Sequence, residues 1–136
     1  MASVTITRVE ADYGFEARDE AGNLFLMDSS AGHGGQGFGL SPMLSLLAAL
    51  GGCSGIDIVS ILGKQRQSFD TLEIRVSGER EEGKTPALWK AVHVQFHIQG
   101  ADPAKAAHAA ALSIDKYCSV AETLRRAGCT ITWELV

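Results

Sequence analysis

Alternation of apolar and polar residues predicts several β-strands. In three segments every second residue is apolar and the residues between are polar or charged, the pattern of a strand with one buried and one wetter face. These segments are residues 72–76, 92–98 and 131–135. The first 28 residues also predict short strands, separated by turn residues at 12–14 and 21–23.

Residues 29–39 lack any apolar period and hold five of the fifteen glycines. We expect a flexible loop here. A plain connection is the favoured interpretation, and a lid over a site is the alternative.

A long helix is predicted over residues 42–64. Ser41 supplies an N-cap hydroxyl and Pro42 suits the first helical position. At about 1.5 Å per residue this helix is roughly 34 Å long, and Asp57 is its only charge between residues 43 and 62. Its length permits a membrane span, but Asp57 and the interior serines and glycines favour a helix buried on all sides. One modest sheet covers only one side of a helix, so we expect a second copy of the chain to cover the rest.

Two further helices are expected in the C-terminal half. Asp102 and Pro103 open an alanine-rich helix over residues 104–114. Ser119 with Glu122 three residues later predicts a capping box and a helix that stops near Gly128. The order of strands, long helix, strands, two helices and strand predicts an α+β fold, with residues 1–136 as a single domain.

Composition narrows the class of protein. The formal charge is −4 and no run of Lys or Arg occurs, so we expect no nucleic-acid partner. Residues 1–13 lack a basic segment followed by an apolar one, so we expect no signal peptide and a cytoplasmic protein. In a reducing compartment three cysteines, an odd number, predict thiols rather than a disulfide framework.

The histidines predict no metal site. His93 and His97 are four residues apart, but on a strand this spacing separates them by about 13 Å, too far for one ion. No glycine-rich phosphate-binding motif is present either. We therefore expect neither a metal nor a cofactor, and solvated histidines.

The cysteines carry the candidate chemistry. Cys53 lies in the middle of the apolar helix behind Gly51 and Gly52, and interior glycines suggest that something approaches the helix closely. A buried structural cysteine is the alternative. Cys118 directly precedes the expected N-cap Ser119, where free N–H groups lower a thiol pKa, and Lys116 adds a cation. Cys129 shares the parity of the last strand's apolar residues and is expected to fill the core.

Two motifs in this sequence resemble those of the OsmC/Ohr superfamily. Residues 41–62, Ser-Pro-Met through Leu-Gly-Gly-Cys-Ser-Gly-Ile-Asp, are similar to its central cysteine helix, and Lys116–Ala121 resembles its second cysteine motif. The order of the expected strands and helices resembles that of the family along essentially the whole chain. The residues of the two motifs are most similar to those of the less-characterised OsmC-like branch.

The resemblance implies an intertwined α+β homodimer with an antiparallel sheet around the long central helix and active sites at the subunit interface. It also implies that Cys53 attacks a hydroperoxide, preferably an organic one, and becomes a sulfenic acid. Cys118 then forms a disulfide with it, which an external thiol or dithiol reduces. The expected function is a cysteine-based thiol peroxidase in oxidative-stress defence.

The sequence departs from the peroxidase pattern near the start of the helix. Met43 and Leu44 stand where peroxidase members carry a glutamate that positions an arginine, and Arg18, the nearest candidate for that arginine, has the wrong offset. Asp57, one helical turn from Cys53, would oppose thiol ionisation if close and charged. Two alternatives stay open: a dimer of this fold that binds a small molecule, and a structural or stress-response dimer without peroxidase activity.

Overall fold

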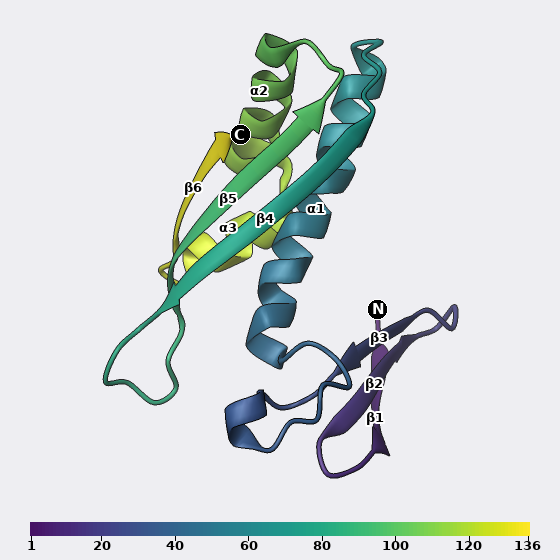
Figure 1. The fold of residues 1–136 in the computed structure, drawn as a ribbon, viewed down its shortest axis with the longest axis vertical. Helices are drawn as coiled ribbons and strands as arrows, with labels where there is room; N and C mark the ends of the chain where they lie inside the picture. The colour runs from purple at the N-terminus through teal and green to yellow at the C-terminus, as the bar shows by residue number, and fades with distance from the viewer. The chain divides into compact units, whose positions relative to one another are not determined.

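The computed structural model describes all 136 residues, which form two compact units, Met1–Leu46 and Leu47–Val136. Strands and helices occur in both, so the α+β class is confirmed (Figure 1). The predicted single antiparallel sheet is wrong, because the strands form two separate three-stranded sheets.

The first unit is built on an antiparallel meander with few buried residues. Its sheet has the order β1-β2-β3, and Ala17 in the central strand pairs with Ile6 on one side and Phe25 on the other. Only Gly14 and Asp28 are buried in this unit. The strands are β1 (Val4–Glu10), β2 (Gly14–Asp19) and β3 (Leu24–Met27).

The glycine-rich segment after β3 is organised around the carboxylate of Asp28. This carboxylate accepts backbone N–H bonds from Ser29 at 2.7 Å, from Gln36 at 2.9 Å and from Phe38 at 3.1 Å. A short 3₁₀ helix, η1 (Ala31–His33), lies within the segment. The N–H of Gln36 is the main cause that holds the pKa of the Asp28 carboxyl below its ordinary value, against the opposite effect of burial. The connection therefore has a fixed internal scaffold.

The helix α1 (Pro42–Lys64) has the predicted bounds. The Ser41 hydroxyl accepts the N–H of Leu44 at 3.4 Å, which confirms the predicted cap. Within one chain α1 is covered on one side only, as expected if its own sheet covers a single face, and cover of the rest by a second copy stays a prediction. One face is buried, whereas apolar side chains elsewhere on the helix, such as Ile56 and Val59, are exposed. The buried residues are Leu47, Leu50, Ser54, Ile58 and Leu62.

By length and composition α1 is also apolar enough to cross a membrane, with a mean hydropathy of 1.8 over its best window. Its buried residues recur every three or four positions, as in a helix that packs one face against a protein core. α1 is therefore a core helix of an α+β fold rather than a membrane span.

The second unit packs helices on one face of a mixed sheet (Figure 1). The strands β4 (Thr71–Arg80) and β5 (Trp89–Gln99) form a long antiparallel hairpin, and β6 (Thr130–Leu135) pairs with β5 in parallel. Along β5 the buried residues Val92, Val94 and Phe96 alternate with more exposed ones, as the sequence predicts. The parallel pairing is possible because two helices connect β5 to β6.

The alanine-rich helix ends earlier than expected. α2 (Pro103–Leu112) is followed by η2 (Ser113–Tyr117), a π-helical turn, and then by α3 (Ser119–Arg126). The Asp102 carboxylate caps α2 by accepting the N–H of Lys105 at 3.1 Å, as predicted. The π turn was not predicted, and it immediately precedes Cys118.

A substitution at Asp28 tests the scaffold of the glycine-rich segment. Because the N–H groups bond the ionised carboxylate, its stabilising effect is present above about pH 3.9, the ordinary Asp value, and is lost as the pH falls through the lower folded-state pKa. In Asp28→Asn we expect faster hydrogen exchange at the amides of Gln36 and Phe38 at pH 7. The difference from the wild type should shrink below about pH 3.9. Exposed Asp12→Asn is the control, and unchanged exchange in the Asp28 variant would contradict this account.

Candidate active site

The middle of α1 presents a thiol and a carboxylate on one side of the helix. Cys53 and Asp57 are four residues apart, and residues at that spacing are neighbours on a helix surface. Both are partly exposed and flank the fully buried Ser54 and Ile58. The buried face therefore fixes the direction in which the thiol and the carboxylate point.

Glycines bring this part of α1 close to β4. A Cβ atom on Gly51 would lie 3.2 Å from Cγ2 of Val76, and one on Gly55 would lie 3.2 Å from Cδ1 of Ile74. The expectation that interior glycines permit a close approach is confirmed for Gly51, and the neighbour is a strand of the same chain. Gly52 faces open space.

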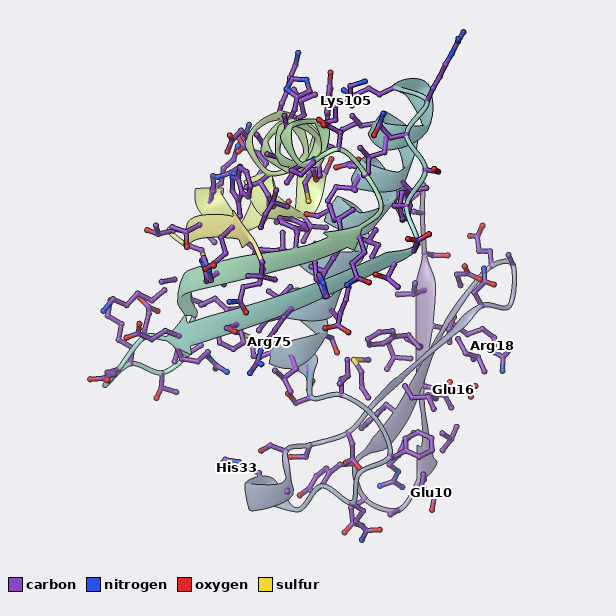
Figure 2. The ribbon with its side chains drawn as sticks, turned by 45° about the horizontal axis from the view of Figure 1, so that its top comes forward. Glu10, Glu16, Arg18, His33, Arg75 and Lys105 are labelled. Carbon is purple, nitrogen blue, oxygen red and sulfur yellow. The ribbon has the colours of Figure 1, made fainter.

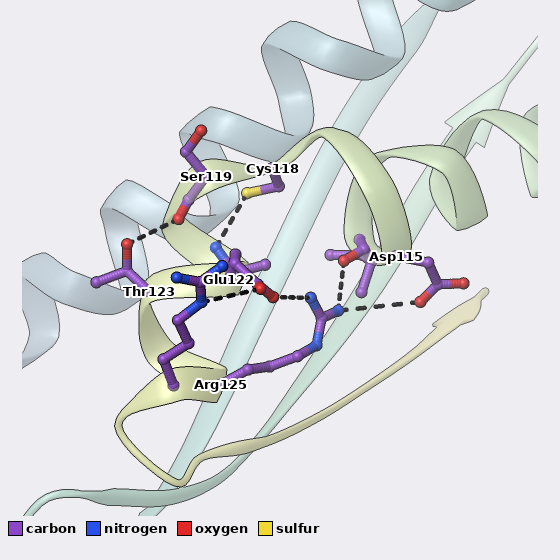
Figure 3. A network of polar contacts seen from close by, with 9 residues as sticks. Asp115, Cys118, Ser119, Glu122, Thr123 and Arg125 are labelled. Carbon is purple, nitrogen blue, oxygen red and sulfur yellow. Dashed lines mark hydrogen bonds and ion pairs between the residues drawn. The ribbon is translucent and has the colours of Figure 1, made fainter.

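Cys118 is itself the N-cap of α3. Its backbone N–H bonds to the carbonyl of Ser113 at 2.8 Å, the five-residue step of the π turn, and its sulfur accepts the N–H of Ala121 at 3.3 Å (Figure 3). The predicted capping box is wrong. The Ser119 carbonyl accepts the hydroxyl of Thr123, and the Glu122 carboxylate bonds to the guanidinium groups of α3.

Arg125 ties α3 to the segment that leads into it. Its guanidinium lies 3.6 Å from Glu122 and 3.9 Å from Asp115, and it donates a hydrogen bond to the carbonyl of Ile114 (Figure 3). Because Ile114 and Asp115 belong to the π turn, this arginine holds the backbone on both sides of Cys118. The position of the sulfur is thus fixed by contacts of α3 and η2 together.

The two elements bring three reactive groups together. The sulfur atoms of Cys53 and Cys118 and a carboxylate oxygen of Asp57 all lie within 4.8 Å of one another. The hydroxyl of Ser113 donates a hydrogen bond of 2.8 Å to Oδ2 of Asp57. The fold therefore unites the two cysteines predicted as site residues, which are 65 positions apart in the chain.

The pKa of the Cys118 thiol is raised, which reverses the expectation from its position at a helix start. Burial is the largest cause that raises its pKa, and the neighbouring Cys53 thiol adds to the effect. The N–H of Ala121 acts in the opposite direction but is outweighed. The expected cation is directed elsewhere, because the ammonium of Lys116 lies 5.3 Å from the centre of the Tyr117 ring.

Two hollows border this cluster. One, of ≈ 350 Å³, is lined by residues that include Cys118, Glu122 and Tyr117. Another, of ≈ 590 Å³, is lined by residues that include Asp57, Lys64 and Tyr117. A small molecule therefore has room to approach beside either the cap or the carboxylate.

Other residues considered from the sequence lie outside the cluster. Cys129 is 5% exposed and packs in the core, as predicted. His93 is not merely solvated, because its ring bonds to Thr132 at 2.7 Å and to Glu134 at 2.6 Å on β6. Arg18 lies in the first unit, where it forms an ion pair with Glu16 on the same strand (Figure 2).

Sequence reasoning missed Ser113 as part of this site. Ser113 is fully buried and orients Asp57, but a single serine near the end of an alanine-rich helix carries no recognisable pattern. The sequence also gives no sign of the π turn that interrupts the helix at this serine. Turns of this kind are frequent at functional sites.

Comparison with known proteins assigns the family. The family described as OsmC-like protein matches residues 32–134, which include both cysteine motifs and all of α1. The chain belongs to the OsmC-like protein family. The resemblance noted in the sequence is confirmed.

Named relatives of this OsmC-like protein include Protein YhfA of Escherichia coli (strain K12). It is 39% identical over 125 residues, which cover 90% of each chain. A solved structure of a hypothetical protein from Aquifex aeolicus VF5 has 26% identity and a TM-score of 0.80, covering 100% of this chain and 96% of that one. The organic hydroperoxide resistance protein OhrB of Bacillus subtilis has a TM-score of 0.67 and 18% identity, covering 100% and 98% of the two chains, and so shares the fold.

The different environments of the three thiols predict different rates of alkylation. Cys53 is partly exposed, whereas Cys118 is 3% exposed with a raised pKa. With iodoacetamide at pH 7.5 we expect Cys118 to react several-fold more slowly than Cys53, because burial restricts access of the reagent to the Cys118 sulfur and raises the pKa of that thiol. Peptide mass spectrometry over time measures both rates, with buried Cys129 as an internal reference. Faster labelling at Cys118 than at Cys53 would refute the assignment.

Proposed function

We propose that this OsmC-like protein is a thiol-dependent peroxidase that reduces organic hydroperoxides through a Cys53–Cys118 cycle. The observation that carries the proposal is the pairing of a partly exposed thiol with a buried one, their sulfur atoms within 4.8 Å. The name of the fold relative OhrB, an organic hydroperoxide resistance protein, supports the class of substrate.

The cycle starts at Cys53 because it is the more accessible of the two sulfurs. Its thiolate attacks one oxygen of the hydroperoxide, the O–O bond breaks, and the alkoxide leaves as an alcohol after taking a proton. Cys53 is then a sulfenic acid. The apolar surface of α1 around Cys53 suits an alkyl substituent better than hydrogen peroxide.

Cys118 completes the cycle. Its sulfur attacks the sulfur of the sulfenic acid, hydroxide leaves as water, and a disulfide forms. A disulfide needs an S–S distance of about 2.05 Å, so the two sulfurs must move closer by less than 3 Å. The N–H of Ala121 bonds to the Cys118 sulfur and stabilises it as it becomes nucleophilic. An external thiol or dithiol then returns two electrons and restores both thiols.

The active form is proposed to be a homodimer in the cytoplasm, with residues 1–136 acting as one domain. Exposed apolar side chains on α1, among them Ile56 at 74% and Val59 at 49%, border an apolar groove between α1 and β4. The first unit also exposes apolar residues on its strands, such as Ile6 and Phe25. A second copy of the chain covers such surfaces and thereby supplies the cover for α1 that its own sheet lacks.

Consumption of hydroperoxide tests the activity. Reduced protein with a dithiol should consume cumene hydroperoxide, and Cys53→Ser should abolish the reaction. Cys118→Ser should leave a sulfenic acid that a dimedone probe detects by mass spectrometry. Cys129→Ser is the matched control and should behave as the wild type. Undiminished turnover in Cys53→Ser would exclude the mechanism, and a retained ligand in a native mass spectrum without turnover would favour a binding protein.

The oligomeric state tests the surface of α1. Ile56→Asp places a charge on the most exposed apolar position of the helix, so the dimer should dissociate at least tenfold more readily, an effect on the order of 1.4 kcal/mol or more. Analytical ultracentrifugation over a range of concentrations measures this. Leu88→Asp, an exposed apolar residue 43% accessible between β4 and β5, is the control. A wild-type monomer, or an unchanged dimer in Ile56→Asp, would contradict the proposed interface.

A further inference from the structure

The cluster at the centre of the site has the composition of a metal centre. Two sulfur atoms and one carboxylate oxygen lie within 4.8 Å of one another, and they come from Cys53, Cys118 and Asp57. We propose that these three residues bind one Zn²⁺ ion per chain. This goes beyond the proposed peroxidase function, because the ion is held by the reduced thiols and does not depend on any peroxide.

The spacing of the ligands matches the requirements of zinc. Zn²⁺ sits about 2.3 Å from a thiolate sulfur and about 2.0–2.2 Å from a carboxylate oxygen in a tetrahedral site. Two sulfurs on such an ion are roughly 3.8 Å apart. The ligand atoms here lie within 4.8 Å of one another, so the distances between them need to shorten only slightly, and rotation of the side chains is enough. Cys53 and Asp57 converge because they are one turn apart on a helix, which is not the case for His93 and His97 on β5.

Neighbouring groups hold the ligands in place. Ser113 donates to Oδ2 of Asp57 at 2.8 Å and so orients the carboxylate towards the sulfurs. Ala121 donates its N–H to the Cys118 sulfur, an interaction that favours a thiolate ligand. Outer hydrogen bonds of this kind orient the ligands in metal sites.

The protein would leave one position on the ion unfilled. Three protein ligands leave a fourth position on zinc, as in catalytic zinc sites, and a water or anion occupies it.

The charges and the ligand types favour zinc over harder ions. Binding removes one proton from each thiol to solvent, and the ion's two positive charges then face three negative ligands. Mg²⁺ and Ca²⁺ prefer oxygen ligands, whereas thiolates select zinc and similar ions. If the proposed peroxidase reaction holds, the bound ion occupies both thiolates. Their oxidation to a disulfide reduces the hydroperoxide to an alcohol and water, takes up two protons from solvent and releases Zn²⁺.

Cobalt substitution tests the site without any measurement of activity. Reduced full-length protein titrated with Co²⁺ under anaerobic conditions should show a thiolate-to-cobalt charge-transfer band in the near ultraviolet. The band should saturate at one ion per chain and disappear when Zn²⁺ is added. Absence of the band in the fully reduced wild type would overturn the proposal.

Variants assign the ligands, with folding checked by circular dichroism. Cys53→Ser and Cys118→Ser should each lose at least half of the charge-transfer intensity, and Asp57→Asn should weaken Zn²⁺ binding at least tenfold in competition with a chromophoric chelator. Ser113→Ala should weaken it about 10–100-fold by freeing Asp57. Cys129→Ser is the matched control and should bind normally. A full band in Cys53→Ser, or its loss in Cys129→Ser, would place the ion elsewhere, and unchanged affinity in Asp57→Asn would remove the carboxylate from the set.

Discussion

The approach of the middle of α1 to the start of α3 is the contact on which the site depends. Neither element holds both thiols by itself, since Cys53 and Asp57 come from α1 and Cys118 comes from the cap of α3. Fully buried small side chains, Ser54 on α1 and Ala121 on α3, occupy this region of the two helices. Larger residues at these positions would push the helices apart and separate the sulfurs. The same core packing that stabilises the second unit therefore sets the distance between its thiols.

Charge is the second constraint on this cluster. Ionising both thiols and the carboxylate together would place three negative charges within 4.8 Å in a partly buried setting. Two neutral hydrogen-bond donors, the Ser113 hydroxyl and the Ala121 N–H, offset part of this repulsion between negative charges. The resemblance noted in the sequence implies that peroxidase members supply a cation, an arginine positioned by a glutamate near the helix start. Met43 and Leu44 occupy the positions of that glutamate in this chain, and the Zn²⁺ ion proposed above would balance the same charges.

Much of the fold follows from the sequence because its signals are local. The alternation in β4 and β5, the Ser41 cap and the apolar run of α1 each predict an element within a few residues of its observed bounds. What the sequence could not supply depends on contacts between distant segments. The division into two sheets and the parallel pairing of β6 are of this kind. So is the raised pKa of Cys118, because burial by residues far away in the chain outweighs the local effect of the helix start.

The π turn of Ser113–Tyr117 sets the direction in which the side chains that follow it, Cys118 first, point from the helix axis. A π turn amounts to one extra residue inserted into an α-helix, and each residue in such a helix advances the side chains by about 100°. A homologue shorter by one residue here could keep every strand, every helix and both cysteines, and still aim the second sulfur away from the first. In this chain the length of the segment between α2 and Cys118 is therefore as necessary to the approach of the two sulfurs as the cysteines themselves.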